Sequence, residues 1–479
     1  MSEPIPTLKV PAEAAEDPSL VLASGKPKND ERLPRAFSLR FSTRGISFAV
    51  NAIVFAQFTF YATDALGLPA GLVGTLFLAA KVVDALTYFV AGFVIDRTNT
   101  RFGKGRPFEL FIVPLWIFTV IAFSTPHMST FWQAAYLFVS FFLIQGVCTS
   151  LLASGEAVYL RRAVDGEVHI AKVISRQGVV LVLAGAVASI LLPQLMATWG
   201  TEPGGWTRIA LVYGIPMILV GLIRFLTIKE RPEAKVADAA AAKVSIKDAV
   251  AALRKNKFVF ILGALILTAN VVMGIGSIVG PYFFKYILGN LGLLSFAGLG
   301  ALLIPVAYLF FPLAVRKIGA MNFVRVGLVV AAVGFAMVCL FPQVPAVVIV
   351  GNLIGSFMTV ITLLINFFTV ETMAYGEWKS GRRVDGLTTS LTHFMSQFGS
   401  GLASGIVGLV MGAVGYNGLA AQQSSEVNVA IIAMAGVIPL VLTLGMLALT
   451  YLYRLDRHIG HIRQDLEAGI YADSSELKL

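Results

Sequence analysis

Charged residues are scarce in this sequence. Asp, Glu, Lys and Arg make up 13% of the 479 residues, whereas an average soluble domain has about 25%. Hydrophobic residues make up 57% of the chain. A soluble globular protein could not cover that much apolar surface, so the composition predicts an integral membrane protein.

Cysteine is almost absent as well. Cys148 and Cys339 are the two cysteines, and both lie inside apolar runs. A disulfide framework or a metal-binding cluster is therefore not expected, and we interpret both residues as packing residues. The chain also lacks a Gly-x-x-x-x-Gly-Lys nucleotide loop and any long soluble segment that could carry a catalytic site. The sequence predicts a protein that is not an enzyme and uses no cofactor or metal.

The basic residues do not form a patch in the sequence. The formal net charge is +10, but the basic residues are spread over many short loops. This distribution argues against a nucleic-acid partner and favours contact with anionic membrane lipid. Residues 1–37 hold acidic residues and prolines, with no basic start followed by an apolar core. They predict a disordered cytoplasmic tail and not a signal peptide.

What the sequence does contain is a series of twelve apolar runs. Each is about twenty residues long, which is enough to cross a bilayer as a helix. The predicted spans are 41–63, 70–95, 107–124, 130–156, 174–197, 207–228, 258–286, 291–315, 322–341, 345–370, 386–414 and 427–452.

The loops between these runs alternate in charge. Five loops are rich in Lys and Arg, and the loops between them have almost none; the basic loops are 97–106, 160–173, 229–257, 316–325 and 376–385. Since basic loops stay on the cytoplasmic side, both termini are expected in the cytoplasm.

The long loop at 229–257 divides the chain in the middle. The sequence therefore predicts an all-α membrane protein with twelve transmembrane helices in two six-helix bundles, at 38–228 and 258–452. The segment 229–257 is expected to be a cytoplasmic central loop, and 453–479 a cytoplasmic tail.

This layout resembles the major facilitator superfamily, whose two bundles are related by an axis along the membrane normal. The loop after the second helix resembles the superfamily signature, and Arg316-Lys317-Ile318-Gly319 resembles its weaker counterpart in the second half. The predicted gate and signature residues are Gly92, Asp96, Arg97, Arg101, Gly103, Lys104 and Arg106. Asp96 is expected to cap or pair with a neighbouring helix end, while the arginines hold the cytoplasmic surface in a closed state.

Two further blocks indicate a branch of the superfamily. The second helix at 73–87, with the turn at 92–107, and the segment Glu371 to Arg383 resemble the glycoside–pentoside–hexuronide cation symporters, in a register that covers 38–460. The resemblance implies a monomeric secondary transporter in a bacterial inner membrane. It would move a sugar-like or glycoside-like solute, or another small organic solute, by alternating access.

The family's second helix usually carries two carboxylates one turn apart. The resemblance matches the first to Asp84 and the second to Tyr88, and it matches a lysine of the eleventh helix to Gln397. One charge of each sign is thus missing, which we interpret as a paired change, although two independent changes remain an alternative. These departures favour proton coupling or no coupling over sodium coupling.

Other family positions are kept only in part. The carboxylate of the first helix falls at Ser47 or Phe48 and is missing, Glu156 is the carboxylate nearest to the fourth-helix position, and Arg176 matches an arginine of the fifth helix. The predicted substrate and coupling residues are Asp84, Tyr88, Glu156, Arg176, Gln177, Asn51, Asn270, Asn366, His393 and Gln397.

The roles of these residues stay open at this stage. Asp84 is expected to hold a proton or a solute hydroxyl, or else to pair with Lys81 or Arg176. Glu156 and Arg176 could form a gate ion pair or contact the solute. His393 could relay protons or line the wall.

Two other functions also remain open. The polar set is sparse among many Phe and Met residues, so the first alternative is a transporter of an amphipathic or aromatic substrate, such as a lysolipid or an organic acid. The second is a membrane receptor that keeps the fold but transports nothing.

Overall fold

The computed structural model describes residues 35–98, 100–164, 167–230, 253–303, 311, 313, 315–381 and 385–472. The tail predicted at 1–37 falls almost wholly outside these residues, as does most of the predicted central loop. Within the described ranges the chain is helical apart from turns, and the single β contact there is an isolated bridge between Thr100 and Gly103.

The first half of the chain forms a group of long helices with short π and 3-10 segments between them. In chain order these are α2 (Arg35–Phe55), α3 (Phe58–Phe60), η1 (Tyr61–Ala65), α4 (Ala70–Arg97), η2 (Arg106–Phe111), α5 (Ile112–Ala122), α6 (Thr130–Phe141), η3 (Phe142–Thr149), α7 (Ser150–Ala163), α8 (Glu167–Trp199) and α9 (Gly205–Thr227).

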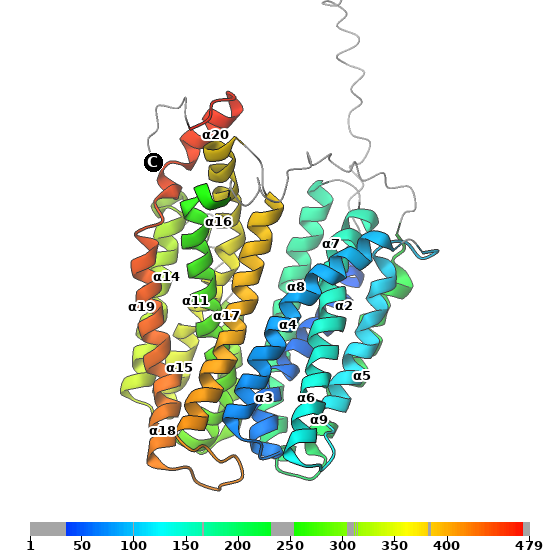
Figure 1. Ribbon diagram of the computed structural model, residues 1–479, viewed down its shortest axis with the longest axis vertical. Helices are drawn as coiled ribbons and strands as arrows, with labels where there is room; N and C mark the ends of the chain where they lie inside the picture. The colour runs from blue at the N-terminus through cyan, green and yellow to red at the C-terminus, as the bar shows by residue number, and fades with distance from the viewer. Residues whose placement is uncertain are drawn as a thin grey trace, which may run out of the picture.

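The second half forms a similar group beside it (Figure 1). Its elements are α11 (Lys257–Tyr282), η4 (Phe283–Ile287), η5 (Leu291–Leu293), α12 (Leu294–Gly298), η6 (Leu299–Leu302), α14 (Ala320–Leu340), α15 (Pro345–Gly355), α16 (Phe357–Ser380), α17 (Asp385–Ala413), α18 (Ser425–Ile432), η7 (Ala433–Val437), α19 (Ile438–Thr450), η8 (Leu455–Arg457) and α20 (Ile459–Glu467).

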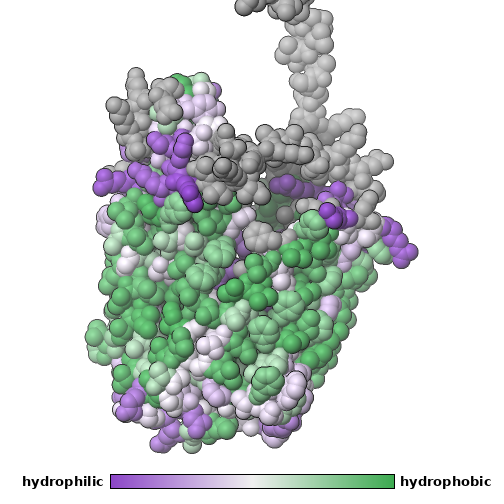
Figure 2. Space-filling view, in the orientation of Figure 1, coloured by the Kyte–Doolittle hydropathy of each residue, from purple (hydrophilic) through white to green (hydrophobic). Residues whose placement is uncertain are grey.

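Nine helical stretches within the described residues are long and apolar enough to cross a membrane. The span predicted at 107–124 is built from η2 and α5, and the span predicted at 345–370 from α15 and α16. The one predicted at 291–315 runs into residues outside the description. Figure 2 shows an apolar flank with hydrophilic residues at both ends, as expected for a multi-pass integral membrane protein.

Several helices are longer than the apolar runs predict. The loop predicted at 160–173 is mostly helical, because α7 continues to Ala163 and α8 begins at Glu167. Likewise α16 runs to Ser380, into the loop predicted at 376–385. A hydropathy window stops at the first charges, whereas the helix continues because basic side chains are favourable in its last turn.

The two halves meet along α4 and α17, which pack closely. A Cβ atom on Gly74 would lie 2.4 Å from the Cα atom of Gly408, so these glycines let the two backbones touch. The helices lie side by side in the lower part of Figure 1 and diverge toward the top, where α20 lies. A second contact between the halves joins α8 and α12.

The segment predicted as a tail at 453–479 contains a docked helix. Ile462 of α20 is fully buried, and the indole Nε1 of Trp378 in α16 donates to Oδ2 of Asp465 at 3.0 Å. The end of the described chain is therefore held against the second half.

Candidate functional site

Asp84 lies midway along α4 and is buried, with 1% of its surface exposed. Its one ion partner among the described residues is Lys81, whose Nζ atom lies 3.5 Å from Oδ2. Neither carboxylate oxygen has a hydrogen bond from a described residue. Ser150 of α7 lies beside the carboxylate, but its hydroxyl donates to the carbonyl of Gln145. A buried carboxylate with so little compensation is costly and is suited to accept another partner.

Two side chains complete this region across the contact between the halves. Tyr88 lies one turn beyond Asp84, and its ring meets the ring of His393 from α17 edge to face, with centroids 4.8 Å apart. His393 lies within electrostatic range of the Asp84 carboxylate. The structure thus brings Asp84, Tyr88 and His393 together, with Lys81 as the nearest cation. We call these four side chains the Asp84 region.

Glu156, by contrast, belongs to a dense ion cluster inside the first half. Its carboxylate accepts hydrogen bonds from Arg44 of α2, Arg224 of α9 and Gln177 of α8. A gate ion pair between Glu156 and Arg176, one of the two predicted alternatives, is not formed in this structure, where Arg176 donates to the Ser38 hydroxyl at 3.1 Å.

A second carboxylate balances this cluster. Nε and Nη2 of Arg224 donate to Glu109 at 2.6 Å and 2.5 Å, which is a bidentate pair. Nε of Arg44 lies 3.5 Å from the same carboxylate. Two arginines and two glutamates therefore sum to zero charge. We call Arg44, Glu109, Glu156 and Arg224 the four-charge cluster, and it ties α2, η2, α7 and α9 together.

The signature turn after α4 is held by a carboxylate from the segment that follows α9. The backbone N–H groups of Lys104, Gly105 and Arg106 donate to Glu230 at 2.6, 2.7 and 2.7 Å. Gly103 has φ +114°, and a Cβ atom there would lie 1.9 Å from Oε2 of Glu230. Glycine is therefore required at this position.

The arginines of the turn differ in their surroundings. The guanidinium of Arg106 donates to the carbonyl of Phe225 at 2.7 Å and lies over its ring. Arg97 and Arg101 are exposed and lie over the rings of Phe93 and Phe102. A Cβ atom at Gly92 would meet nothing within 4 Å, so no steric reason requires glycine there. The Asp96 side chain lies outside the described ones, so its predicted capping role stays a prediction.

The remaining predicted site residues are spread over both halves. Asn51 is buried and donates to the Thr119 hydroxyl at 2.9 Å. Asn270 donates to the Ile266 carbonyl and accepts from the Ser396 hydroxyl at 3.0 Å. Both asparagines thus join helices within one half. Gln397 is half-buried in α17, and the Asn366 side chain lies outside the described ones.

The predicted set omits three members of the four-charge cluster, Arg44, Glu109 and Arg224. Each is a charged residue inside or at the edge of an apolar run. Charged residues at such depth are rare and need partners, so this position is the signal that could have identified them.

A bundle of membrane-spanning helices in two halves, with an under-compensated carboxylate at the contact between them, is typical of a secondary transporter of the major facilitator type. The profile of the family described as MFS/sugar transport protein matches residues 46–457. The chain belongs to this family, the glycoside–pentoside–hexuronide branch of the superfamily. It is a transporter of sugar-like solutes and not an enzyme.

Individual relatives are similar along most of their length. The chain is 29% identical over 449 residues to the isoprimeverose transporter of Lactiplantibacillus pentosus, covering 90% of this chain and 91% of that one. It is 29% identical over 434 residues to the putative glycoside/cation symporter YagG of Escherichia coli (strain K12), covering 88% and 91%.

Solved structures agree on the fold. The nucleoside transporter NupG superposes with a TM-score of 0.59 at 15% identity, over 86% of this chain and 98% of that chain. A bacterial homolog of the human lysosomal transporter Spinster gives 0.58 at 17% identity, over 91% and 98%. At such low sequence identity, the similarity to these structures is evidence for the fold alone.

Proposed function

We propose that this transporter couples solute movement to protons through Asp84, or moves its solute without an ion, and does not use sodium. The observation that carries the proposal is the Asp84 carboxylate, which is buried beside a single ammonium 3.5 Å away and has no hydrogen bond from the described residues. Such a group can take up a proton at little cost, since the neutral acid needs less compensation than the carboxylate.

The case against sodium comes from the neighbours of Asp84. A hard cation prefers several oxygen ligands, ideally including a second carboxylate. Here Tyr88 occupies the position one turn on, and the Lys81 ammonium already supplies positive charge beside Asp84. His393, within electrostatic range of Asp84, is exposed, and an imidazole is a group that can accept and release protons.

We propose that the solute is a glycoside that binds between the two halves as they rock about the contact of α4 and α17. The names of relatives, an isoprimeverose transporter and a putative glycoside/cation symporter, support this class. The proposed setting is a bacterial inner membrane, with the chain as a monomer among lipids and both termini cytoplasmic. The basic loops and the bacterial relatives support it.

The test is uptake of labelled isoprimeverose and methyl glucoside into proteoliposomes under an imposed pH gradient. For Asp84→Asn we expect concentrative uptake to fall by about 10²-fold or more, the scale of a lost proton-transfer group. Exchange of solute at equal concentration on both sides should persist, because it needs no proton movement. Glu426→Gln, which removes an exposed carboxylate of α18, is the matched control and should behave as wild type.

Two results would contradict the proposal. Strong stimulation by external sodium, with choline as the substitute ion, would overturn the argument from Tyr88 and Lys81. Wild-type accumulation by Asp84→Asn would remove Asp84 from the coupling mechanism. An uncoupled carrier would show exchange but no response to either gradient.

A further inference from the structure

A second buried carboxylate joins the halves at the end of the molecule opposite the basic turn at 97–106. Asp64 ends the first membrane span, and its side chain is 4% exposed. Lys285 Nζ donates to Oδ1 at 2.6 Å, and the Tyr286 hydroxyl donates to the same oxygen at 2.7 Å. The Tyr416 hydroxyl donates to Oδ2. These three donors come from the second half, and the Thr63 hydroxyl of the first half adds a bond to Oδ2 at 3.1 Å.

The backbone and aromatic contacts around Asp64 are also close. The hydroxyls of Thr63 and Tyr282 are hydrogen-bonded at 2.8 Å, and the rings of Phe60 and Tyr282 meet edge to face with centroids 5.1 Å apart. A Cβ atom on Gly418 would lie 2.0 Å from the carbonyl oxygen of Thr63. The loop after α17 is therefore pressed directly against the end of the first span.

The chemistry of these contacts makes them depend on the two halves staying together. Burial, with the Asp64 carboxylate as the next cause, raises the pKa of Tyr416 well above its usual value. The phenol thus stays protonated and acts as a donor. If the halves separate here, Asp64 loses three charge-assisted hydrogen bonds at once and keeps only the bond from Thr63, so water has to replace the other three.

A second pair of contacts at the same end joins α8 to η5 and α12. The Gln194 amide donates to the Gly292 carbonyl at 3.0 Å and to the Ser295 hydroxyl at 3.2 Å. These hydrogen bonds also hold the two halves together at this end. Because they are between neutral groups, they contribute less than the charged contacts of Asp64.

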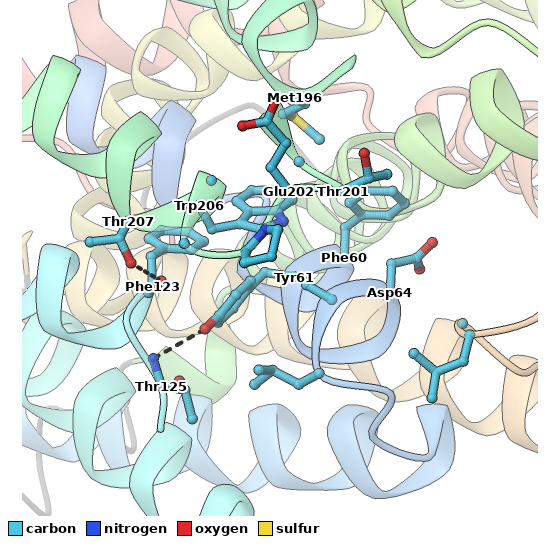
Figure 3. A pocket seen from close by; sticks show the side chains of 18 of the residues that line it. Phe60, Tyr61, Asp64, Phe123, Thr125, Met196, Thr201, Glu202, Trp206 and Thr207 are labelled. Carbon is cyan, nitrogen blue, oxygen red and sulfur yellow. Dashed lines mark hydrogen bonds between the residues drawn. The ribbon is translucent and has the colours of Figure 1, made fainter. Parts of the chain in front are cut away.

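A cavity of about 720 Å³ lies next to Asp64. The loops around Thr125, Thr201 and Gly418 line it, as do Asp64 and Lys285, so both halves contribute to its wall. Figure 3 shows Asp64 near the Phe60 ring, with Tyr61 reaching across to its hydrogen bond with Thr125. The space therefore lies at the end of the molecule, beside the contact that closes it.

We propose that Asp64, with Lys285, Tyr286 and Tyr416, is the latch of the outer gate, and that the cavity is the vestibule outside it. The latch holds the halves together on the outer side, so that the carrier faces the cytoplasm; opening to the outside requires Asp64 to leave its three donors. These are positioning residues. The inference rests on the proposed orientation of the chain but not on the proposed ion coupling.

The test measures the separation of the halves directly in the full-length chain. Spin labels are placed at Phe131→Cys and Val429→Cys, at exposed positions near the same end in the first and second half. Cys148 and Cys339 are replaced by alanine. For Asp64→Asn we expect the population with the longer distance to rise at least about tenfold, which corresponds to about 1.4 kcal/mol.

Two variants make the result specific. Tyr416→Phe keeps the ring that packs against Tyr282 and should shift the population in the same direction by a smaller factor. Combined with Asp64→Asn it should add little, because Tyr416 acts through that carboxylate. Tyr136→Phe is the matched control, since its hydroxyl donates to Ile121 within the first half, and should leave the distances unchanged.

Wild-type distances in both Asp64→Asn and Tyr416→Phe would overturn the latch. If Asp64→Asn does not fold, the distances in Tyr416→Phe alone test the latch, and wild-type distances there would overturn it. Labelling of the Phe131→Cys variant by an impermeant maleimide on intact cells would support the placement of this end of the molecule on the outer side of the membrane. Labelling confined to inverted vesicles would overturn that placement. Neither readout involves transport, so a failure of ion coupling through Asp84 would not change them.

Discussion

Asp84 and Glu156 are two carboxylates deep in the same half of the molecule, and they are compensated very differently. Glu156 shares two arginines with Glu109 and also accepts a bond from Gln177. Asp84 has one lysine at 3.5 Å and no hydrogen bond from a described residue. Glu156, whose carboxylate has a full set of partners, is suited to hold helices together. Asp84, whose carboxylate has few partners, is suited to exchange them during transport.

Asp64 adds a third arrangement to this comparison. Its carboxylate is as well satisfied as that of Glu156, but three of its donors, Lys285, Tyr286 and Tyr416, come from the other half, and the neighbouring Thr63 hydroxyl adds one bond from its own half. The number of bonds to a buried acid therefore does not define its role. Whether the donors move with the acid decides between a structural tie and a latch.

The largest effect is expected from breaking the four-charge cluster. Arg224→Met leaves Glu109 and Glu156 with Arg44 alone, so the buried charge no longer sums to zero. Removing one partner of a buried ion pair costs about 3–5 kcal/mol. We expect a marked fall in the apparent melting temperature of the detergent-solubilised protein, with poor recovery of folded material.

Arg208 in the same helix gives the matched control. Its pair with Glu202 is exposed, at 56% and 47% of the side-chain surface, and such a pair contributes about 0–1 kcal/mol. Arg208→Ala should therefore melt close to wild type. If Arg224→Met melted no lower than Arg208→Ala, the structural reading of the cluster would be wrong.

A smaller effect of the opposite sign is expected at the Asp84 region. The double variant Lys81→Met with Asp84→Asn removes both charges at once, so no unpaired charge stays buried. Such replacements are often neutral or stabilise by about 1–4 kcal/mol. We expect an unchanged or higher melting temperature together with loss of concentrative uptake. A melting temperature as low as that of Arg224→Met would show that the pair is structural, against the proposal for Asp84.

The architecture was predictable because bilayer thickness sets helix length. Apolar runs of about twenty residues predicted twelve spans, and nine helical stretches among the described residues meet that criterion. The resemblance in the second helix and in the block from Glu371 to Arg383 predicted the family that the sequence profile confirms. Lys81 beside Asp84 was one of the predicted alternatives, because a spacing of three places both on one helix face.

The partners of the buried charges were not predictable in the same way. Glu156 and Arg224 are separated by 68 positions, and Asp64 and Tyr416 by 352. Helix spacing says nothing about such pairs, since they depend on how the helices pack. The contact of Tyr88 with His393 likewise depends on how α4 and α17 pack against each other.

The smallest effect is expected from breaking a neutral hydrogen bond between two helices. Asn270 of α11 accepts from Ser396 of α17 within the second half, and such bonds between membrane helices average about 0.6 kcal/mol. Asn270→Ala should therefore lower the melting temperature only slightly and leave uptake of the labelled sugars intact, with Ser396→Ala as the paired variant. A large loss of uptake in Asn270→Ala but not in Ser396→Ala would mean that the amide contacts the solute. Asn270 would then belong with Asp84 among the groups that exchange partners, although its bond in this structure is satisfied.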